Sequence, residues 1–466
     1  MSYSHNNQYR CTIIRGKAKN DLDNLLPAYA QILYRITPIK KELFPEEFNK
    51  SLSSFMPDAE KKTLDNHRTE IAGKLFGMYY EDSGTIFLSD RAKKFLNDYD
   101  QPAFFKDMCY RFQFPNGMDK IQTLLDRIEH GIKIRPLCFV VKLVIDAYDK
   151  YNMVLSQNEI GYYALNNLDV LSGKASVDEV IAQIKDDKQH NILRKISYPG
   201  KAESYCTQHI REQLNYLELA NLIRVNNRNV FPNLKERKTI KILSESVHDI
   251  GFNYLKYDLQ DKDSEAKFYS DWQKYYSNVT VDEAKQFSTS VEALEYNVDA
   301  TGKQVATAFA IDTTALGDDG EALVCSYEKR RVSQYDKRLV GRIIPLGKIK
   351  GLGYDIQSVF ANEGDNPEFA KYIEVKSTKR VTAPDENDSE WVDVINVTRN
   401  EWMAAQQYQN SYEIYRVYFT QVGPKIFIIK NPYRKNEDGI VQTIPTMFRI
   451  EFSNNAVDKA VAIGQL

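Results

Sequence analysis

Apolar residues recur at helical spacing in the segment KKTLDNHRTEIAGKLFGMYYEDSGTIFLSDRAKKFL. Leu64, Ile71 and Leu75 place one apolar face on a helix over its first part. The pieces MYY and TIFLS then alternate like short strands around a turn at residues 82–84. The pattern predicts a helix followed by a β-hairpin.

The same pattern occurs a second time, in SYCTQHIREQLNYLELANLIRVNNRNVFPN. Its apolar stripe is formed by Cys206, Ile210, Leu214 and Leu217, and LIRV and NVF flank a turn. Further helices are predicted upstream of both copies, in LDNLLPAYAQILYRI, FVVKLVIDAYDKY and SQNEIGYYALNN. The last of these begins with a capping box from Ser156 to Glu159. A helix followed by a hairpin is the second half of a winged helix-turn-helix. We therefore expect two winged-helix-like subdomains, at residues 20–125 and 130–245, with a generic helical domain carrying hairpins as the alternative.

Residues 246–300 are polar and helical in pattern, which predicts a helical connector, and a different pattern begins at residue 301. A helix in GEALVCSYEKRRVSQYD precedes the strand-like pieces YDIQSVF, KYIEVKST, EWVDVINV, YRVYF and KIFIIKN. One helix, TRNEWMAAQQYQ, interrupts them and opens with a capping box from Thr398 to Glu401. Strands interleaved with helices predict an α/β domain over residues 301–466. The predicted fold class is multidomain, with a mainly α N-terminal part and an α/β C-terminal domain.

Composition excludes several classes of protein. The 466 residues contain 62 Lys+Arg and 64 Asp+Glu, and 42% are hydrophobic, so neither a uniformly basic packaging protein nor a disordered chain fits. Five cysteines without a C-x-x-C pair argue against a disulfide framework or a structural zinc site. No apolar run is long enough for a membrane span. A cytoplasmic protein without a membrane partner is expected.

Two carboxylates and a lysine stand on neighbouring predicted strands of the C-terminal domain. Asp355 follows a glycine-rich turn, and the next strand, IEVK, carries Glu374 and Lys376 on one face. If the strands form a hairpin, Asp355 lies beside them. Adjacent carboxylates repel each other, and a hard cation such as Mg²⁺ explains the pair. The lysine would hold or polarise the water that attacks a phosphorus atom.

The string GYDI…IEVK resembles the core of PD-(D/E)XK nucleases, although Tyr354 stands where proline is common. The resemblance implies metal ligands at Asp355 and Glu374 and a catalytic set completed by Lys376. A further acid, Glu328, would come from the preceding helix, as in members similar to Holliday-junction resolvases. The alternatives are a solvated edge pair for Glu374 and Lys376 and a solvated helix face for Glu328. Glu401 is assigned to its helix cap.

The N-terminal half resembles BpuJI-like type IIS restriction endonucleases over most of residues 8–225. The resemblance is carried by RCTIIRGKAKNDLDNLLPAYA, TLDNHRTEIAGKLFGMYYED, QPAFFKD and HIREQLNYLELANLIR. It implies a bacterial enzyme in which a winged-helix-like recognition region for double-stranded DNA is fused to a resolvase-like nuclease. Cleavage would fall at a distance from an asymmetric site. Because one centre cuts one strand, a transient homodimer through the nuclease domain is expected, together with a cognate DNA methyltransferase.

Three sets of residues are candidates for contacting DNA. The first is a basic arm at residues 1–19, which has no acidic residue and would lie along phosphates or in a minor groove. The other two are the exposed faces of the two candidate recognition helices, whose side chains would read base edges. Hydrated surfaces are the alternative for each set, and His209 is expected to be structural. The candidates are Arg10, Arg15, Lys17 and Lys19; Asn66, His67, Arg68, Glu70 and Lys74; and Gln208, Arg211 and Asn215.

Two other functions stay open at this point. One is a non-specific or structure-specific nuclease acting in repair or phage defence. The other is a winged-helix DNA-binding regulator with an inactive C-terminal domain, against which the intact Asp355, Glu374 and Lys376 argue.

Overall fold

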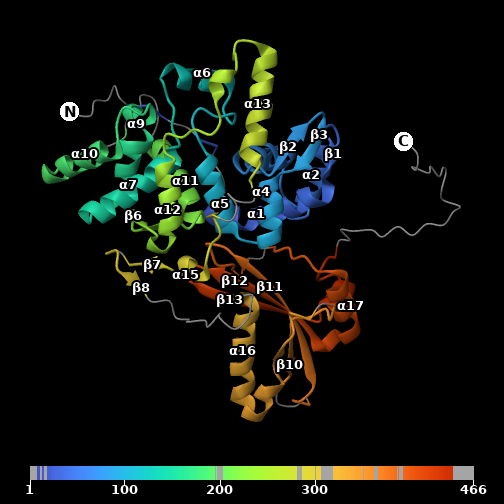
Figure 1. Cartoon of the computed structure of the whole chain (residues 1–466). Coiled ribbons are helices and arrows are strands. Elements are labelled where there is room, and N and C mark those ends of the chain that lie inside the picture. The colour runs from blue at the N-terminus through green and yellow to red at the C-terminus, as the bar shows by residue number, and fades with distance from the viewer. Residues whose placement is uncertain are drawn as a thin grey trace, which may run out of the picture.

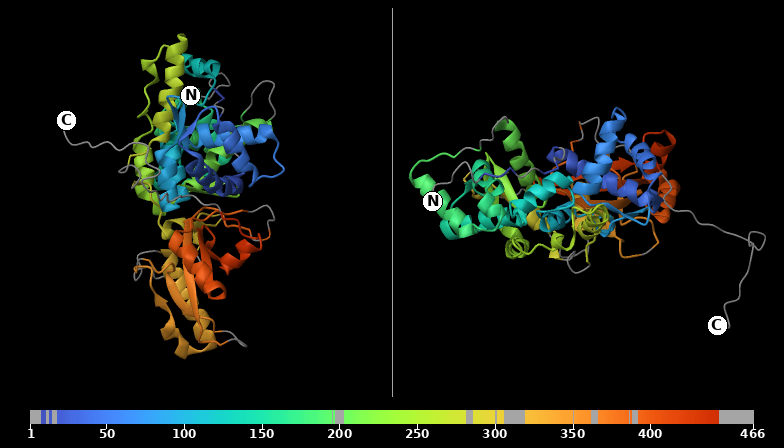
Figure 2. Two further views of the ribbon diagram at one scale, coloured as in Figure 1. Left: turned by 90° about the vertical axis from the view of Figure 1, so that its right-hand side faces the viewer. Right: turned by 90° about the horizontal axis from the view of Figure 1, so that it is seen from above.

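A helix-rich N-terminal region and a C-terminal region built on one sheet make up the chain (Figure 1). In the left view of Figure 2 the sheet again lies below the helices. The computed structural model describes residues 8–10, 13–14, 18–194, 196, 203–280, 286–299, 301–305, 319–349, 351–361, 366–385, 387 and 392–443. In these parts no helix combines the length and apolar character that crossing a membrane requires.

The first half of the N-terminal region has the element order and strand order expected of a winged helix. Its three-stranded sheet is ordered β1-β3-β2, so the first strand pairs with the last. The recognition-type helix begins as an α-helix and continues as a π-helix, labelled η2. The elements are α1 (Lys19–Ile36), β1 (Ile39–Lys40), α2 (Phe44–Ser53), α3 (Lys61–Asn66), η2 (His67–Leu75), β2 (Tyr79–Asp82) and β3 (Thr85–Leu88), followed by α4 (Asp90–Asp98), α5 (Gln101–Arg111) and α6 (Ile121–Glu129).

The second half repeats this order, with a sheet ordered β4-β6-β5. The predicted capping box at Ser156 is present and begins α8. Ile210, Leu214 and Leu217 are buried, as the predicted stripe requires. The elements are α7 (Pro136–Tyr151), β4 (Leu155–Ser156), α8 (Gln157–Ile160), η3 (Gly161–Leu165), α9 (Leu168–Leu171), α10 (Val177–Gln189), α11 (Glu203–Leu219), β5 (Ile223–Asn226), β6 (Asn229–Pro232), η4 (Leu234–Glu236) and α12 (Arg237–Glu245).

The predicted connector is helical, but it packs on the first half instead of linking two regions freely. Its main helix, α13 (Lys262–Ser277), lies beside β2 (Figure 1). The Tyr276 hydroxyl donates to the Leu75 carbonyl at 2.8 Å, and Lys274 pairs with Asp82 at 2.8 Å. The remaining elements are η5 (Tyr254–Lys256), α15 (Val291–Leu294), β7 (Asn297–Val298) and β8 (Gln304–Val305).

The C-terminal region is a five-stranded sheet in the order β13-β12-β11-β10-β9. Strands β11 and β12 are parallel, and the other neighbours are antiparallel. Helix α16 packs on one face, while α17, which connects β11 to β12, covers part of the other (Figure 1). The elements are α16 (Asp319–Tyr335), η6 (Lys337–Arg342), β9 (Ile344–Pro345), β10 (Ile356–Val359), β11 (Ala370–Lys379), α17 (Arg399–Tyr408), η7 (Gln409–Ser411), β12 (Tyr412–Thr420), β13 (Gly423–Lys430) and α18 (Pro432–Glu437).

One strand prediction is wrong. EWVDVINV was expected to be a strand, but its described residues 392–397 pair with no strand. Their polar side chains make specific contacts instead. Asp393 accepts a hydrogen bond from Arg416 at 2.7 Å, and Asn396 donates to the Tyr99 hydroxyl at 2.7 Å. The apolar residues Ile395 and Val397 of this stretch pack with Tyr412 and Ile414, so they belong to an unpaired segment on the α17 face of the sheet.

The C-terminal end of β11 joins the two regions. The Tyr99 carbonyl accepts hydrogen bonds from the Lys379 backbone and from the Thr378 hydroxyl, both at 3.0 Å. A few residues later, the Asp23 carboxylate accepts from the backbone and hydroxyl of Thr382 at 2.9 and 2.8 Å. Asp23 is fully buried, and burial raises the pKa of its carboxyl. The junction thus depends on a buried acid in α1.

We predict that Asp23→Ala weakens this junction, because it leaves the N–H and hydroxyl of Thr382 without their acceptor and removes the carboxylate 4.0 Å from the buried Arg380. The expected loss is about 3 kcal/mol in the free energy of unfolding, measured by urea denaturation. Asp21→Ala is the matched control, since Asp21 lies in the same turn of α1 but is exposed. Its expected loss is below about 1 kcal/mol. Equal losses in both variants would contradict the role of Asp23.

Candidate functional site

Asp355 and Glu374 meet where β10 begins beside β11. The Asp355 backbone N–H donates to the Ile373 carbonyl at 2.9 Å, which continues the antiparallel ladder that pairs Ile356 with Ile373. The Asp355 carboxylate accepts a hydrogen bond from the Val375 N–H at 2.8 Å. The hairpin expected from the sequence therefore exists, and it brings Asp355 next to the strand position of Glu374.

Lys376 completes the set on the same face of β11. Its Nζ lies 2.7 Å from Glu374 Oε1 and 2.9 Å from Glu401 Oε2. Burial raises the pKa of Glu374 to about 8; Lys376 opposes this, while the charges of Asp355 and Glu401 add to it. The site is thus short of positive charge.

This shortage fits a hard divalent cation held by Asp355 and Glu374. Within the described residues no cluster of three or more His, Cys, Asp or Glu side chains has the geometry of a metal site. Mg²⁺ does not require such a cluster, because it keeps several waters and is commonly bound through one or two carboxylates plus substrate phosphates. The donor set is therefore compatible with Mg²⁺.

Glu328 does not belong to this set, so its placement among the catalytic acids is corrected. It belongs to α16, which packs on the opposite face of the sheet, and its carboxylate is enclosed there by donors. Burial alone would raise the pKa of Glu328, but the hydrogen bond from Arg331 and the charge of Lys371 outweigh burial and hold it at about 2. The donors are Arg331 at 2.7 Å, Ser358 at 2.6 Å, Tyr415 at 2.8 Å and Lys371 at 3.2 Å. A carboxylate satisfied in this way is a structural ion pair.

Side chains that the sequence interpretation missed surround Lys376. The Arg416 guanidinium donates to the Lys376 carbonyl at 3.3 Å and is held by Asp393 at 2.7 Å. The Tyr99 ring, from the N-terminal region, lies 5.9 Å from that guanidinium. Glu401, which also contacts Lys376, did have a sequence signal, its capping box, but that signal concerned only the helix end. The others are brought together by the tertiary structure.

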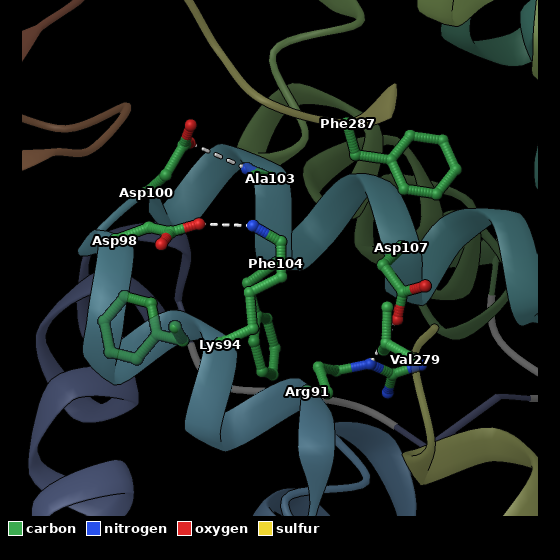
Figure 3. Close-up of a pocket in the computed structure, with 10 residues that line it drawn as sticks. Arg91, Lys94, Asp98, Asp100, Ala103, Phe104, Asp107, Val279 and Phe287 are labelled. Carbon is green, nitrogen blue, oxygen red and sulfur yellow. Dashed lines mark hydrogen bonds and ion pairs between the residues drawn. The ribbon is translucent and has the colours of Figure 1, made fainter. Parts of the chain in front are cut away.

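A small cavity lies between α4 and α5, where Val279 and Phe287 also line it (Figure 3). Its volume is about 20 Å³, enough for about one water molecule. The buried pair Arg91–Asp107, at 2.5 Å, lines it, and so does Asp100. Asp100 also accepts from the Thr289 N–H at 2.7 Å. A cavity of this volume, lined by paired side chains, is a packing feature between α4 and α5.

The first candidate recognition helix, formed by α3 and η2, exposes fewer of the predicted side chains to solvent than expected. His67 is fully buried and bonds to the Tyr29 hydroxyl, and Arg68 is buried and bonds to Asn49 and Asp65 at 2.7 and 2.6 Å. Both predictions are wrong, because the prediction assumed α-helical periodicity through η2. Hydrogen bonds in a π-helix run i→i+5, so its turn is wider. The face left outward carries Asn66, Glu70 and Lys74, of which Glu70 and Lys74 pair at 2.9 Å.

In the second candidate recognition helix, α11, the three predicted side chains lie on the solvent-facing side, as expected. Arg211 is exposed, and Gln208 and Asn215 are partly exposed one turn to either side. The structure gives Arg211 no ion pair with any described residue. His209 is buried and lies 3.5 Å from both Arg10 and the Ile13 N–H, so it is structural as expected.

The described part of the N-terminal arm rests on the second half of the N-terminal region. The Tyr9 N–H donates to the Asn166 carbonyl at 2.9 Å, and the Ile14 carbonyl accepts from Tyr216 at 3.1 Å. Lys19 is the first residue of α1 and pairs with Glu218 at 3.1 Å, so its charge is already compensated. Arg15 and Lys17 lie outside the described residues.

Comparison with known proteins identifies the N-terminal region. Residues 3–273 match the family described as the N-terminal part of restriction endonuclease BpuJI, which is more than half of the chain. The chain belongs to the BpuJI family. A solved structure of the BpuJI endonuclease binding domain, in complex with pyrene- and phenanthrene-modified DNA, is 50% identical with a TM-score of 0.58. The match covers 59% of this chain and 100% of that one.

The C-terminal region has a separate match. Residues 320–429 match the family described as the C-terminal part of the protein NO VEIN. These residues span α16 to most of β13 and include Asp355, Glu374 and Lys376. No curated protein matches the chain. The comparisons therefore connect the BpuJI-family chain to restriction endonucleases through its N-terminal region.

We predict that Mg²⁺ stabilises the folded protein through Asp355 and Glu374. At a Mg²⁺ concentration ten times its dissociation constant, the expected gain is about 1.4 kcal/mol, seen as a rise in melting temperature. The gain should be lost in Asp355→Asn and Glu374→Gln. Glu328→Gln is the control: it should cost about 3 kcal/mol of stability by unbalancing the buried ion pair, yet keep the Mg²⁺-dependent gain. A full gain in Glu374→Gln would refute the site.

Proposed function

We propose that this member of the BpuJI family is a type IIS restriction endonuclease. In this proposal the N-terminal region recognises a short asymmetric sequence in double-stranded DNA, and the C-terminal region hydrolyses phosphodiester bonds at a distance from it. The observation that carries the proposal is Asp355, Glu374 and Lys376 on one sheet face, in a chain with a BpuJI-type N-terminal region.

The C-terminal topology supports the nuclease part. A helix precedes an antiparallel strand pair that carries Asp355 and the E-x-K residues, and a second helix then leads to a parallel strand. This is the order expected of a PD-(D/E)XK core. The DNA-bound BpuJI binding domain, 50% identical to the matched part of this chain, supports DNA binding by the N-terminal region.

The chemistry follows from the charges at the site. When bound, Mg²⁺ would stabilise the negative charge that develops on the phosphate oxygens. Asp355 and Glu374 would hold it on the sheet face. The Lys376 ammonium, kept beside Glu374 by its ion pairs, would orient the attacking water and offset charge on the phosphate. Since one centre cuts one strand, double-strand cleavage requires two C-terminal regions in a transient homodimer. A cognate methyltransferase would protect host DNA.

Mapping of cleavage ends tests this function. Purified protein is incubated with a sequenced plasmid and Mg²⁺, and all new ends are sequenced. We expect ends at a defined distance from one shared short motif. Ends without a common motif would instead indicate a non-specific nuclease, and binding without any cleavage would indicate a regulator.

We predict that Asp355→Ala, Glu374→Ala and Lys376→Ala abolish cleavage and retain specific DNA binding, because all three lie away from α11. Cleavage is measured on plasmid and binding by gel shift or fluorescence anisotropy. If binding disappears together with cleavage in these variants, the functional centre lies elsewhere.

Arg211→Ala should have the opposite effect. Because an arginine on an exposed helix face can read guanine through two hydrogen bonds, its loss should cost about 1–3 kcal/mol of specific binding. Melting temperature should stay within a degree or two of wild type, since Arg211 is exposed. Arg338→Ala, at an exposed arginine in η6, is the control. Unchanged affinity for the specific site in Arg211→Ala would remove α11 from the readout.

A further inference from the structure

Lys376 lies between two carboxylates that come from different elements. Glu374 is on the same strand, two residues away, and Glu401 is in the first turn of α17. The Lys376 Nζ is 2.7 Å from the first carboxylate and 2.9 Å from the second. The Glu374 and Glu401 side chains are 4% and 14% exposed, so solvent screens these contacts only weakly.

The position of Glu401 is determined by its helix cap. Its Oε2 accepts from the Thr398 N–H at 2.9 Å, while its own N–H donates to the Thr398 hydroxyl at 3.3 Å. The same oxygen that closes the cap therefore also contacts Lys376. The side-chain conformation of Glu401 that closes the capping box is also the one that reaches the lysine.

The start of α17 is also held against the turn that carries Asp355. A Cβ atom at Gly353 would lie 2.5 Å from the Asn400 carbonyl oxygen and 2.8 Å from the Ala404 side chain, so only glycine permits this approach. Gly353 also has a positive φ of +79°. The Tyr412 hydroxyl donates to the Gly353 carbonyl at 2.8 Å. Asp355, Lys376 and Glu401 are thus fixed relative to one another by the backbone.

The capping box at the start of α10 shows what a cap does by itself. Ser176 and Glu179 form the same reciprocal hydrogen bonds at the start of α10. Glu179 is exposed, and its carboxylate makes no ion pair with any residue that the structure describes. The contact of Glu401 with Lys376 is therefore an addition to capping and not a consequence of it.

We propose that Glu401 is a positioning residue that keeps the Lys376 ammonium at the centre formed with Asp355 and Glu374. This inference rests on the proposed nuclease function. If Glu374 acts on a cation, its ion pair with Lys376 competes with that role. Glu401 gives the ammonium a second acceptor that has no such competing role. The lysine then stays on the reactive face of β11 when Glu374 is engaged elsewhere.

The test compares Glu401→Ala, Glu401→Gln and the cap-only control Glu179→Ala in the full-length chain. The first readout is reductive methylation of Lys376, followed by mass spectrometry, and needs no activity. Removing one of two acceptors should make Lys376 react several-fold faster in Glu401→Ala. In Glu401→Gln the amide oxygen still accepts from Thr398 and Lys376, so labelling should stay near the wild-type rate. Glu179→Ala should leave Lys376 labelling unchanged.

The second readout is plasmid cleavage, with kcat and KM determined separately. Glu401→Ala should lower kcat about 10- to 100-fold with little change in KM, as for other residues that orient a reactive group, and Glu401→Gln should restore most of it. Glu179→Ala should cut like wild type. If Glu401→Ala loses thermal stability only as Glu179→Ala does, with labelling and kcat unchanged, Glu401 is a cap alone and the inference is wrong. Faster labelling with normal kcat would also overturn it.

Failure of the proposed function gives a different result. A wild-type protein that does not cut DNA under any tested condition overturns the nuclease proposal. The labelling experiment would then still report whether Glu401 holds Lys376, so the two failures are distinguishable.

Discussion

The two-residue alternation of side chains along β11 is the constraint on which the C-terminal region depends. Odd-numbered positions such as Ile373 face α16, while Glu374 and Lys376 face the opposite side with Asp355. β11 is central in the sheet, and helices pack on both sides of that sheet, so the carboxylates of Glu328 on one face and Glu374 on the other are buried. Slipping the strand by one residue would exchange the two faces and destroy both sets at once.

The buried carboxylates on the two faces of the sheet have different surroundings, and their pKa values are shifted in opposite directions. On the α16 face, Glu328 is surrounded by donors from Arg331, Ser358, Lys371 and Tyr415, and its pKa is held at about 2. On the other face, burial and neighbouring carboxylates raise the pKa of Glu374 to about 8. A satisfied carboxylate stabilises the fold, whereas an undercompensated one is free to bind a cation. This contrast separates a structural acid, Glu328 of α16, from a candidate functional acid, Glu374 of β11, on opposite faces of one sheet.

The same strand also connects the site to the N-terminal region. Thr378, two residues after Lys376, donates to the Tyr99 carbonyl, and the following segment bonds to Asp23 in α1. The connector helix α13 packs on β2, so the connector is fixed to the first half of the N-terminal region. In the proposed function, the part of the chain that reads DNA therefore touches the strand that carries the cutting residues.

Local patterns in the sequence determined the two helix–hairpin units, the capping boxes at Ser156 and Thr398, and the pairing of Asp355 with the E-x-K strand, because each depends on spacing within a few residues. The inward turn of His67 and Arg68, the separation of Glu328 from the site and the non-strand course of residues 392–397 involve partners 19 or more residues away. So does the contact of Glu401 with Lys376, two residues 25 positions apart in sequence, whose carboxylate and ammonium meet at 2.9 Å. Periodicity states which side chains share a face of an element, but only the packing of elements decides what that face meets.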